Sequence, residues 1–183
     1  MDTVIQTIPF AFPGPPQVRR VRCAFQTRLG GASQGPFGQG NISLTVGDDP
    51  GRVQANREAL RRQLGYEALA ELTQVHGDVM RFEPQPVAAP VASYSRPPSD
   101  PPVSAKTGAM APATPDPALP PQGDGHATSR PGLALLIKTA DCQPVLLAHA
   151  GGAHVAALHV GWRGNRLNCP GGGVAAFCAR YDL

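Results

Sequence analysis

The chain has 183 residues, 42% of them hydrophobic, which is enough to bury a sizeable core within one domain. The net charge of +3 is mild and no run of basic residues favours a nucleic-acid partner; Arg19, Arg20 and Arg22 come nearest and are expected to be solvated. No apolar run approaches the roughly 20 residues that span a bilayer, and residues 1–16 lack the pattern of a signal peptide. We therefore expect a cytoplasmic protein without a membrane partner.

The four cysteines bear on the chemistry that the chain can carry. Cys23, Cys142, Cys169 and Cys178 are widely spaced, and no export signal directs the chain to an oxidising compartment. We expect free thiols or metal ligands rather than disulfides.

The first third of the chain predicts short strands around a glycine-rich loop. Residues 22–26 have the composition of a strand, residues 30–40 form the loop, and residues 41–46 are again strand-like. Residues 72–75 then lead into His76 and Gly77.

A helix is predicted to begin at Asp48-Asp49-Pro50. Proline suits the first helical turn, and the two carboxylates suit the positive end of the helix dipole. Val53, Leu60 and Leu64 fall on one side, and Gly65 is placed to end the helix.

Residues 84–121 predict an insert. They hold 12 of the 21 prolines, mixed with alanine, serine and threonine, so they cannot form a hydrogen-bonded ladder and have little to bury. We expect a flexible or polyproline-like excursion within a single domain of residues 1–183. An alternative role is as a ligand for a proline-binding module, since residues 98–101 fit P-x-x-P.

The pattern after the insert is rich in strands. Residues 133–137 are continuously apolar, as expected of a strand buried on both faces. Residues 145–149 and 154–160 predict two strands joined by a Gly151-Gly152 turn, which suits a hairpin. A helix is predicted over residues 174–181.

Strand geometry separates two of the five histidines. His154 and His159 are five residues apart, so in a regular strand their side chains point to opposite faces and cannot serve one site. His159 shares its face with Val155 and Ala157. A histidine on an apolar face is often a core residue, but the G-W-R-G turn that follows favours a functional role.

His76 and Cys142 lie where predicted strands end. Cys142 sits in the polar T-A-D-C-Q-P segment between two apolar strands, beside Asp141, although a buried packing role is the ordinary one for cysteine. Zinc accepts cysteine sulfur and histidine nitrogen, and three protein ligands leave a position open for catalysis. His76, Cys142 and His159 are therefore candidate ligands, but they lie far apart in the chain and no local motif links them.

Several short motifs resemble one known family. In chain order they are F-Q-T-R-L-G-G (25–31), G-N-I-S-L (40–44), V-G-D-D (46–49), Q-V-H-G (74–77), T-A-D-C-Q-P-V (139–145) and H-V-G-W-R-G (159–164). Together they closely resemble the YfiH-like laccase-domain proteins, also called the polyphenol oxidase or purine nucleoside phosphorylase family. The resemblance covers residues 25–83 and 122–183 and leaves out the insert.

The resemblance implies an α/β (α+β) fold of the layered α/β/β/α type and a zinc ion bound by His76, Cys142 and His159. It implies phosphorolysis of adenosine, inosine, guanosine or methylthioadenosine, together with adenosine deamination, and a bacterial branch is linked to peptidoglycan editing. Purine nucleoside and phosphate are then the expected partners of a monomer or weak homodimer. Family members usually continue beyond the position that ends this sequence, so we expect a shortened, C-terminally incomplete domain.

The other residues of the expected site follow from the chemistry. Zinc in an open site activates water near neutral pH, as deamination at a purine C6 requires. Arg28 and Arg163 are candidates to hold phosphate, because a guanidinium matches phosphate bidentately; the alternative for each is a surface or fold-locking ion pair. Asp141 is expected to orient a ligand, with acid/base catalysis as the alternative. Asn41 could contact substrate or serve only as a turn residue.

Other functions stay open at this point. A copper polyphenol oxidase is the first alternative, since His₂Cys also suits one copper, but no H-x-H pair predicts the second cluster of a multicopper enzyme. A metal-free cysteine hydrolase with Cys142 as nucleophile and His159 as base is the second. The third is an inactive fragment that serves as a binding piece.

Overall fold

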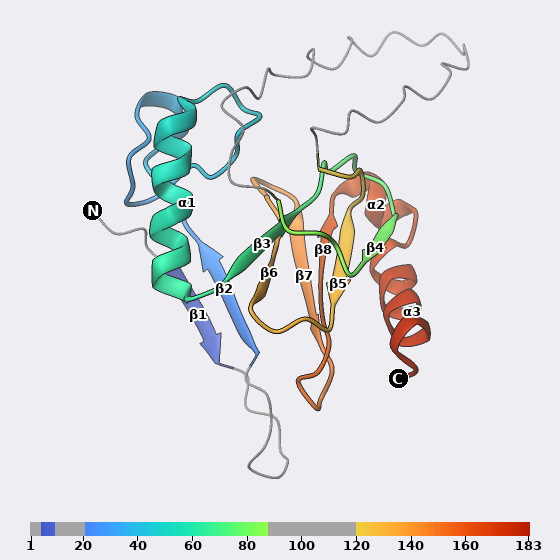
Figure 1. Ribbon diagram of the computed structural model, residues 1–183. Coiled ribbons are helices and arrows are strands. Elements are labelled where there is room, and N and C mark those ends of the chain that lie inside the picture. Colours follow the sequence, from blue (N-terminus) through green and yellow to red (C-terminus); the bar gives the residue numbers. More distant parts are fainter. Residues whose placement is uncertain (1–4, 10–20, 88–119) are drawn as a thin grey trace, which may run out of the picture.

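The computed structural model describes residues 5–9, 21–87 and 120–183. Its elements form layers, with helix α1 (Pro50–Leu64) on one side, strands in the middle, and helices α2 (Trp162–Arg166) and α3 (Cys169–Tyr181) on the other (Figure 1). The layered α/β architecture expected from the sequence is therefore confirmed. None of the helices in the described ranges has the length and apolar character needed to cross a membrane.

The described strands form three small sheets. The largest has the order β4 (Met80–Phe82), β5 (Gly125–Thr128), β8 (Val155–Val160) and β7 (Gln143–Ala148), with β4 parallel to β5 and the other pairs antiparallel. In the second sheet, β3 (Ala68–Glu71) runs parallel to β6 (Leu133–Leu136). In the third, β1 (Ile5–Pro9) pairs antiparallel with β2 (Arg22–Gln26).

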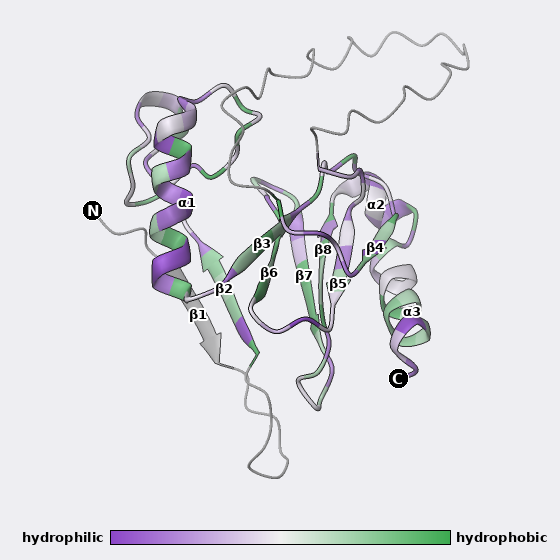
Figure 2. Ribbon diagram, viewed as in Figure 1, coloured by the Kyte–Doolittle hydropathy of each residue, from purple (hydrophilic) through white to green (hydrophobic). Residues whose placement is uncertain are grey.

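Local signals position α1 as predicted. The Asp49 side chain caps the helix by accepting a hydrogen bond from the Arg52 amide at 2.9 Å, and Pro50 occupies the first turn. Gly65 ends it in a left-handed conformation, with φ at 68°. Val53 and Leu60 are buried, and the helix alternates between hydrophobic and hydrophilic bands (Figure 2).

The main core lies between β8 and α3. Ala156, Leu158 and Val160 occupy one face of β8 and pack with Phe177 of α3 and its neighbours. The helix approaches closely, since a β-carbon at Gly173 would overlap with the Leu158 side chain.

The two histidines of the β8 region lie on opposite faces, as their spacing predicted. His154 stacks on Tyr181 of α3, with ring centroids 4.2 Å apart. His159 follows the other parity and is directed away from α3, toward Asp124. The Gly151-Gly152 hairpin between β7 and β8 is also confirmed.

The strand predictions for residues 41–46 and 133–137 differ from the structure. Residues 41–46 are not a strand, because the Asn41 side chain hydrogen-bonds the backbone of Ser43 and the carboxylate of Asp48 and so replaces ladder bonds with a local turn. The strand predicted at residues 133–137 was expected to be buried on both faces, but in β6 only Leu133 is fully buried. The remaining β6 side chains line a hollow.

The sequence also understated the helices. The glycine-rich residues 169–173 belong to α3, which begins five residues before the predicted start, and G-W-R-G forms the short helix α2 rather than a turn. Strands β1, β3, β4 and β5 were not predicted, and the strand expected over residues 72–75 before His76 is absent, because β3 ends at Glu71. Residues 88–119, which include the P-x-x-P segment, lie outside the described residues, as do Arg19 and Arg20.

The two ends of the insert are anchored next to β3. The Val87 amide donates to the Leu69 carbonyl at 2.8 Å, where the chain leaves. Where it returns, Thr73 donates its amide to the Pro121 carbonyl at 3.1 Å and its hydroxyl to the Pro120 carbonyl at 2.7 Å.

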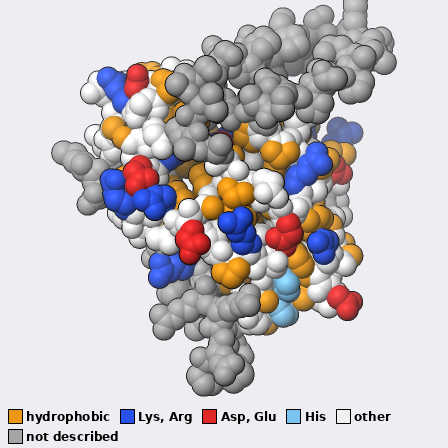
Figure 3. All heavy atoms as spheres, in the orientation of Figure 1, with side chains coloured by type: hydrophobic (Ala, Val, Ile, Leu, Met, Phe, Trp, Pro, Cys, Tyr) orange, Lys and Arg blue, Asp and Glu red, His pale blue; other side chains and the backbone are white. Residues whose placement is uncertain are grey.

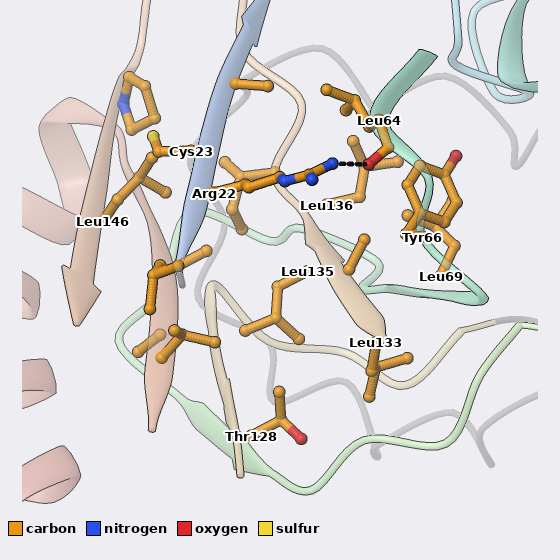
Figure 4. Close-up of a pocket in the computed structure, with 18 of the residues that line it drawn as sticks. Arg22, Cys23, Leu64, Tyr66, Leu69, Thr128, Leu133, Leu135, Leu136 and Leu146 are labelled. Carbon is orange, nitrogen blue, oxygen red and sulfur yellow. Dashed lines mark hydrogen bonds between the residues drawn. The ribbon is translucent and has the colours of Figure 1, made fainter. Parts of the chain in front are cut away.

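A large hollow separates β2 and the end of α1 from β6 and β7. Its volume is about 1660 Å³. Leu133, Leu135 and Leu136 of β6 line it opposite Cys23 and Arg22, whose guanidinium donates to the Leu64 carbonyl at 2.9 Å (Figure 4). In the middle of the molecular face shown in Figure 3, apolar side chains lie among basic and acidic ones.

Candidate metal centre

Three loop or strand-end residues meet at one edge of the sheets. His76 lies in the loop between β3 and β4, Cys142 directly precedes β7, and His159 lies near the end of β8. One potential ligand atom from each lies within 4.8 Å of the others. Cys142 Sγ is 3.8 Å from His76 Nε2, and the two imidazole rings meet edge to face with centroids 4.7 Å apart.

A buried carboxylate joins two of these residues. Asp124, just before β5, is fully buried and accepts a hydrogen bond from His159 Nδ1 at 2.8 Å. It also accepts the backbone amides of Val75, His76 and Gly77 at 3.2, 2.9 and 2.7 Å. Burial opposes the ionised form, but these hydrogen bonds outweigh it and hold the pKa of Asp124 below its usual value.

The Asp124 contact fixes the tautomer of His159. A carboxylate only accepts hydrogen bonds, so Nδ1 carries a proton, and in the neutral imidazole the lone pair is then on Nε2. This arrangement is the usual one behind a metal-binding histidine. Asp124 was missed in the sequence, where only its place between Gly123 and Gly125 distinguishes it from a surface aspartate.

The backbone around His76 is bent to suit this carboxylate. His76 has φ at 60°, a left-handed conformation that costs a non-glycine residue roughly 1–2 kcal/mol. The bend turns three consecutive amides toward Asp124, and their hydrogen bonds offset that cost. The His76 loop is therefore held by the buried carboxylate.

A second set of hydrogen bonds, made by Gln74, connects the loops of His76 and Cys142. The Gln74 side chain donates to the Lys138 carbonyl and accepts from the Lys138 amide, both at 2.8 Å. Lys138 also pairs with the buried Glu71, which Arg57 contacts at 2.9 Å. Burial raises the pKa of Glu71, but the two cations more than compensate and lower it overall.

Glycine permits close approach at the centre. A β-carbon at Gly161 would lie 2.7 Å from His76 Cδ2 and 3.2 Å from Cys142 Sγ. At Gly164 it would lie 3.0 Å from the Gly77 carbonyl oxygen. Because neither glycine of H-V-G-W-R-G has a side chain, α2 can lie directly against the His76 loop.

The arrangement fits a metal ion. In a tetrahedral zinc site, bond lengths of about 2.0–2.3 Å place neighbouring ligand atoms roughly 3.3–3.6 Å apart. The 3.8 Å between Cys142 Sγ and His76 Nε2 needs only a small contraction to reach this range. The His₂Cys donor set suits zinc or copper, and three protein ligands leave a further position open.

Asp141 lies beside Cys142 rather than beside a histidine. Its carboxylate is exposed and accepts a hydrogen bond from the Cys142 thiol. Burial, followed by the negative charges of Asp141 and Asp124, raises the pKa of the Cys142 thiol.

The structure separates Arg163 from the other two expected substrate residues. Arg28 and Asn41 line the hollow, and the Arg28 guanidinium packs over Gly38. Arg163 lies exposed in α2 with its guanidinium carbon 5.2 Å from the centre of the Trp162 ring. No hydrogen bond or ion pair in the described residues links these three to His76, Cys142 or His159.

Fold and site together define a layered α/β protein with a candidate His–Cys–His metal centre. Comparison with known proteins adds the family: residues 22–183 match the family model described as multi-copper polyphenol oxidoreductase laccase. The chain belongs to this family, whose members include YfiH.

Curated relatives carry the name purine nucleoside phosphorylase. One from Pseudomonas aeruginosa is 35% identical over 153 residues, which cover 83% of this chain and 49% of the relative. YfiH of Escherichia coli is 30% identical, covering 83% of this chain and 51% of the relative. The chain thus spans about half the length of the curated relatives it matches.

Solved structures agree in fold. A Neisseria meningitidis protein of the DUF152 family superimposes with a TM-score of 0.63 at 29% identity, covering 93% of this chain and 57% of that one. YfiH of Bacillus licheniformis superimposes with a TM-score of 0.64 at 24% identity, covering 88% and 54%, and supports the fold alone.

Proposed function

We propose that the chain binds zinc through His76, Cys142 and His159 and acts on purine nucleosides. In the main reaction, phosphate replaces the base at the ribose C1′, so that adenosine and phosphate give adenine and ribose 1-phosphate. In the second, adenosine and water give inosine and ammonia. Inosine, guanosine and methylthioadenosine are further proposed substrates of the phosphorolysis.

One observation carries the proposal. Three ligand atoms converge within 4.8 Å, with His159 oriented by a buried carboxylate, in a chain whose relatives are named purine nucleoside phosphorylases. When bound, zinc would supply a Lewis acid that activates water near neutral pH.

The chain's own residues would bind the substrates and orient the metal ligands. Asp124 holds the proton on His159 Nδ1 and keeps Nε2 free for the ion. Arg163, exposed in α2, would meet phosphate, and Arg28 and Asn41 would contact substrate from the hollow. Asp141 would orient the Cys142 sulfur with which it shares a hydrogen bond.

Copper polyphenol oxidation is the second candidate, favoured by the description of the family. The same three ligands could hold one copper. All five histidines are described, but the remaining three do not gather: His126 is buried in β5, while His149 and His154 face each other at the hairpin end with ring centroids 5.8 Å apart. Within the described ranges, His76, Cys142 and His159 form the only cluster of three or more potential ligands.

A metal-free cysteine hydrolase fits less well. Such enzymes depend on a thiolate formed at a lowered pKa, usually beside positive charge. Burial and the nearby carboxylates instead raise the pKa of Cys142, which makes the free thiolate scarce at neutral pH.

The deciding experiment incubates the chain with adenosine and phosphate and separates the products by chromatography. We expect adenine with ribose 1-phosphate, or inosine, from the wild type, and a loss of at least about 100-fold in Cys142→Ala. Cys178→Ala, at a free cysteine of α3, is the matched control and should keep full activity.

Two results would contradict the proposal. Activity that survives Cys142→Ala would refute the assigned site. Elemental analysis by mass spectrometry should find zinc near one equivalent; stoichiometric copper together with oxygen consumption on phenols would establish the second candidate instead.

A further inference from the structure

The only tryptophan of the chain lies exposed beside the metal centre. Trp162 opens α2, and 69% of its surface is accessible, more than for any other large apolar side chain among the described residues. Indole rings are usually largely buried because their apolar area is large. Nothing in the packing of α2 requires tryptophan at such an exposed position.

The neighbours of Trp162 fix its place at the rim of the centre. Gly161, directly before it, leaves no room for a β-carbon against His76 and Cys142. Gly164, two residues after it, abuts the Gly77 carbonyl of the His76 loop. The indole therefore projects from a backbone segment that contacts the ligand loop at both ends.

The indole has one face engaged. The Arg163 guanidinium lies over the ring, with its central carbon 5.2 Å from the ring centroid, which is within the range of a cation–π contact. That contact restrains the side chain, while the high exposure of Trp162 leaves area for a flat ligand.

The His76 loop adds apolar surface nearby. Val75 and Val79 of this loop are 45% and 44% exposed, so the loop that carries His76 exposes apolar as well as polar groups. A site whose occupant were only phosphate or water would have no use for such groups. A planar heteroaromatic ring with a polar sugar attached matches the combination.

We propose that Trp162 is the platform on which the purine ring of the nucleoside stacks, with Arg163 behind the indole. This inference rests on the proposed function and names the group that recognises the base. Stacking on an aromatic side chain accepts any purine, so the platform explains tolerance among adenosine, inosine and guanosine better than a hydrogen-bonded pocket would.

The single tryptophan provides a direct test. In the zinc-loaded 183-residue chain without phosphate, adenosine, inosine and guanosine should each quench the Trp162 fluorescence saturably, whereas ribose should not. By calorimetry, Trp162→Leu should weaken adenosine binding about 10-fold, and Trp162→Phe, which retains a ring, less than about 3-fold. Leu167→Ala, at another exposed apolar residue beside α2, is the matched control and should leave affinity unchanged.

The outcomes separate the platform from the chemistry. Quenching by purine nucleosides with no product in the assay would support the platform and refute the proposed reaction. Product formation with an equal KM in Trp162→Leu would support the reaction and overturn the platform. Equal affinity in wild type and Trp162→Leu, equal quenching by ribose, or no saturable adenosine binding to the wild type would each overturn it as well.

Discussion

The candidate metal centre and the hollow differ in how they are packed: polar partners hold the first, and partly buried apolar side chains line the second. At the edge, each polar group of Asp124 and Gln74 has a partner, and glycines bring backbone into contact with the ligands. In the hollow, leucines of β6 and β7 border an apolar space of about 1660 Å³, and Leu146 is 37% exposed (Figure 4).

The contrast shows which contacts hold the three candidate ligands in position. His76 and His159 are connected through one buried carboxylate, and the Cys142 loop is connected through one amide side chain. The side chains that line the hollow are only partly packed and, within the described ranges, make no hydrogen bond to these three residues that could align them. Breaking a buried polar partner should therefore cost more than trimming an apolar side chain of the hollow.

The largest expected effect is that of Asp124→Ala. It leaves His159 Nδ1 and three amides without their buried acceptor, so the free energy of unfolding should fall by about 3–5 kcal/mol and zinc affinity by about 10–100-fold. Urea unfolding with a chelator and a competition titration with zinc measure the two effects. Asp124→Asn, which keeps the shape, should lose less, and a cost below about 1 kcal/mol for Asp124→Ala would refute the role of the carboxylate.

A pair of leucine substitutions compares core and hollow directly. Leu158 is fully buried against α3, so Leu158→Ala should cost about 3 kcal/mol. Leu135 borders the hollow and is only partly buried, so Leu135→Ala should cost about 1 kcal/mol. Denaturant unfolding of both variants measures the gap, and equal costs would mean that the hollow is packed as tightly as the core in solution.

The last predicted effect is a loss of stability in acid. His126 is fully buried, neither ring nitrogen has a hydrogen-bond partner in the described part of the chain, and burial lowers its pKa to about 4, although Glu71 partly opposes the shift. The unfolded state, with a pKa near 6.5, binds the proton more readily, so stability contributed by neutral His126 is lost as pH falls from about 6.5 toward 4.

His126→Leu should remove this pH dependence. Between pH 7 and pH 5 the free energy of unfolding of the wild type should fall by about 2 kcal/mol because of His126, and that of the variant should not show this fall. Thermal unfolding of both proteins at the two pH values measures it. A wild type whose stability changes with pH no more than that of the variant would contradict the assignment.

Sequence reasoning succeeded where the cause is local. The ends of α1 follow from Asp49, Pro50 and Gly65, each of which acts on its own helix terminus. It failed at residues 41–46, because the composition of a strand cannot reveal that Asn41 turns its side chain onto the backbone. It also failed on the burial of β6, which depends on layers distant in sequence.

The candidate site divides in the same way. Ordered motifs pointed to His76, Cys142 and His159, although their spacing alone left core packing open as an interpretation for Cys142 and His159. Asp124 could not be found, because its partners lie 35 and 48 residues away and a single aspartate between glycines forms no periodic pattern. Residues that position ligands emerge only once the chain is folded.

The anchoring of the insert has a consequence for how the chain tolerates change. Val87 is hydrogen-bonded to Leu69, and Pro120 and Pro121 are hydrogen-bonded to Thr73, so both junctions of the insert lie against one short stretch of backbone upstream of His76. The closure entropy of such a segment grows by only about 0.6 kcal/mol for each doubling of its length. A reporter domain or a purification handle could therefore be exchanged for the native segment at this position while Asp124, His76, Cys142 and His159 keep their places.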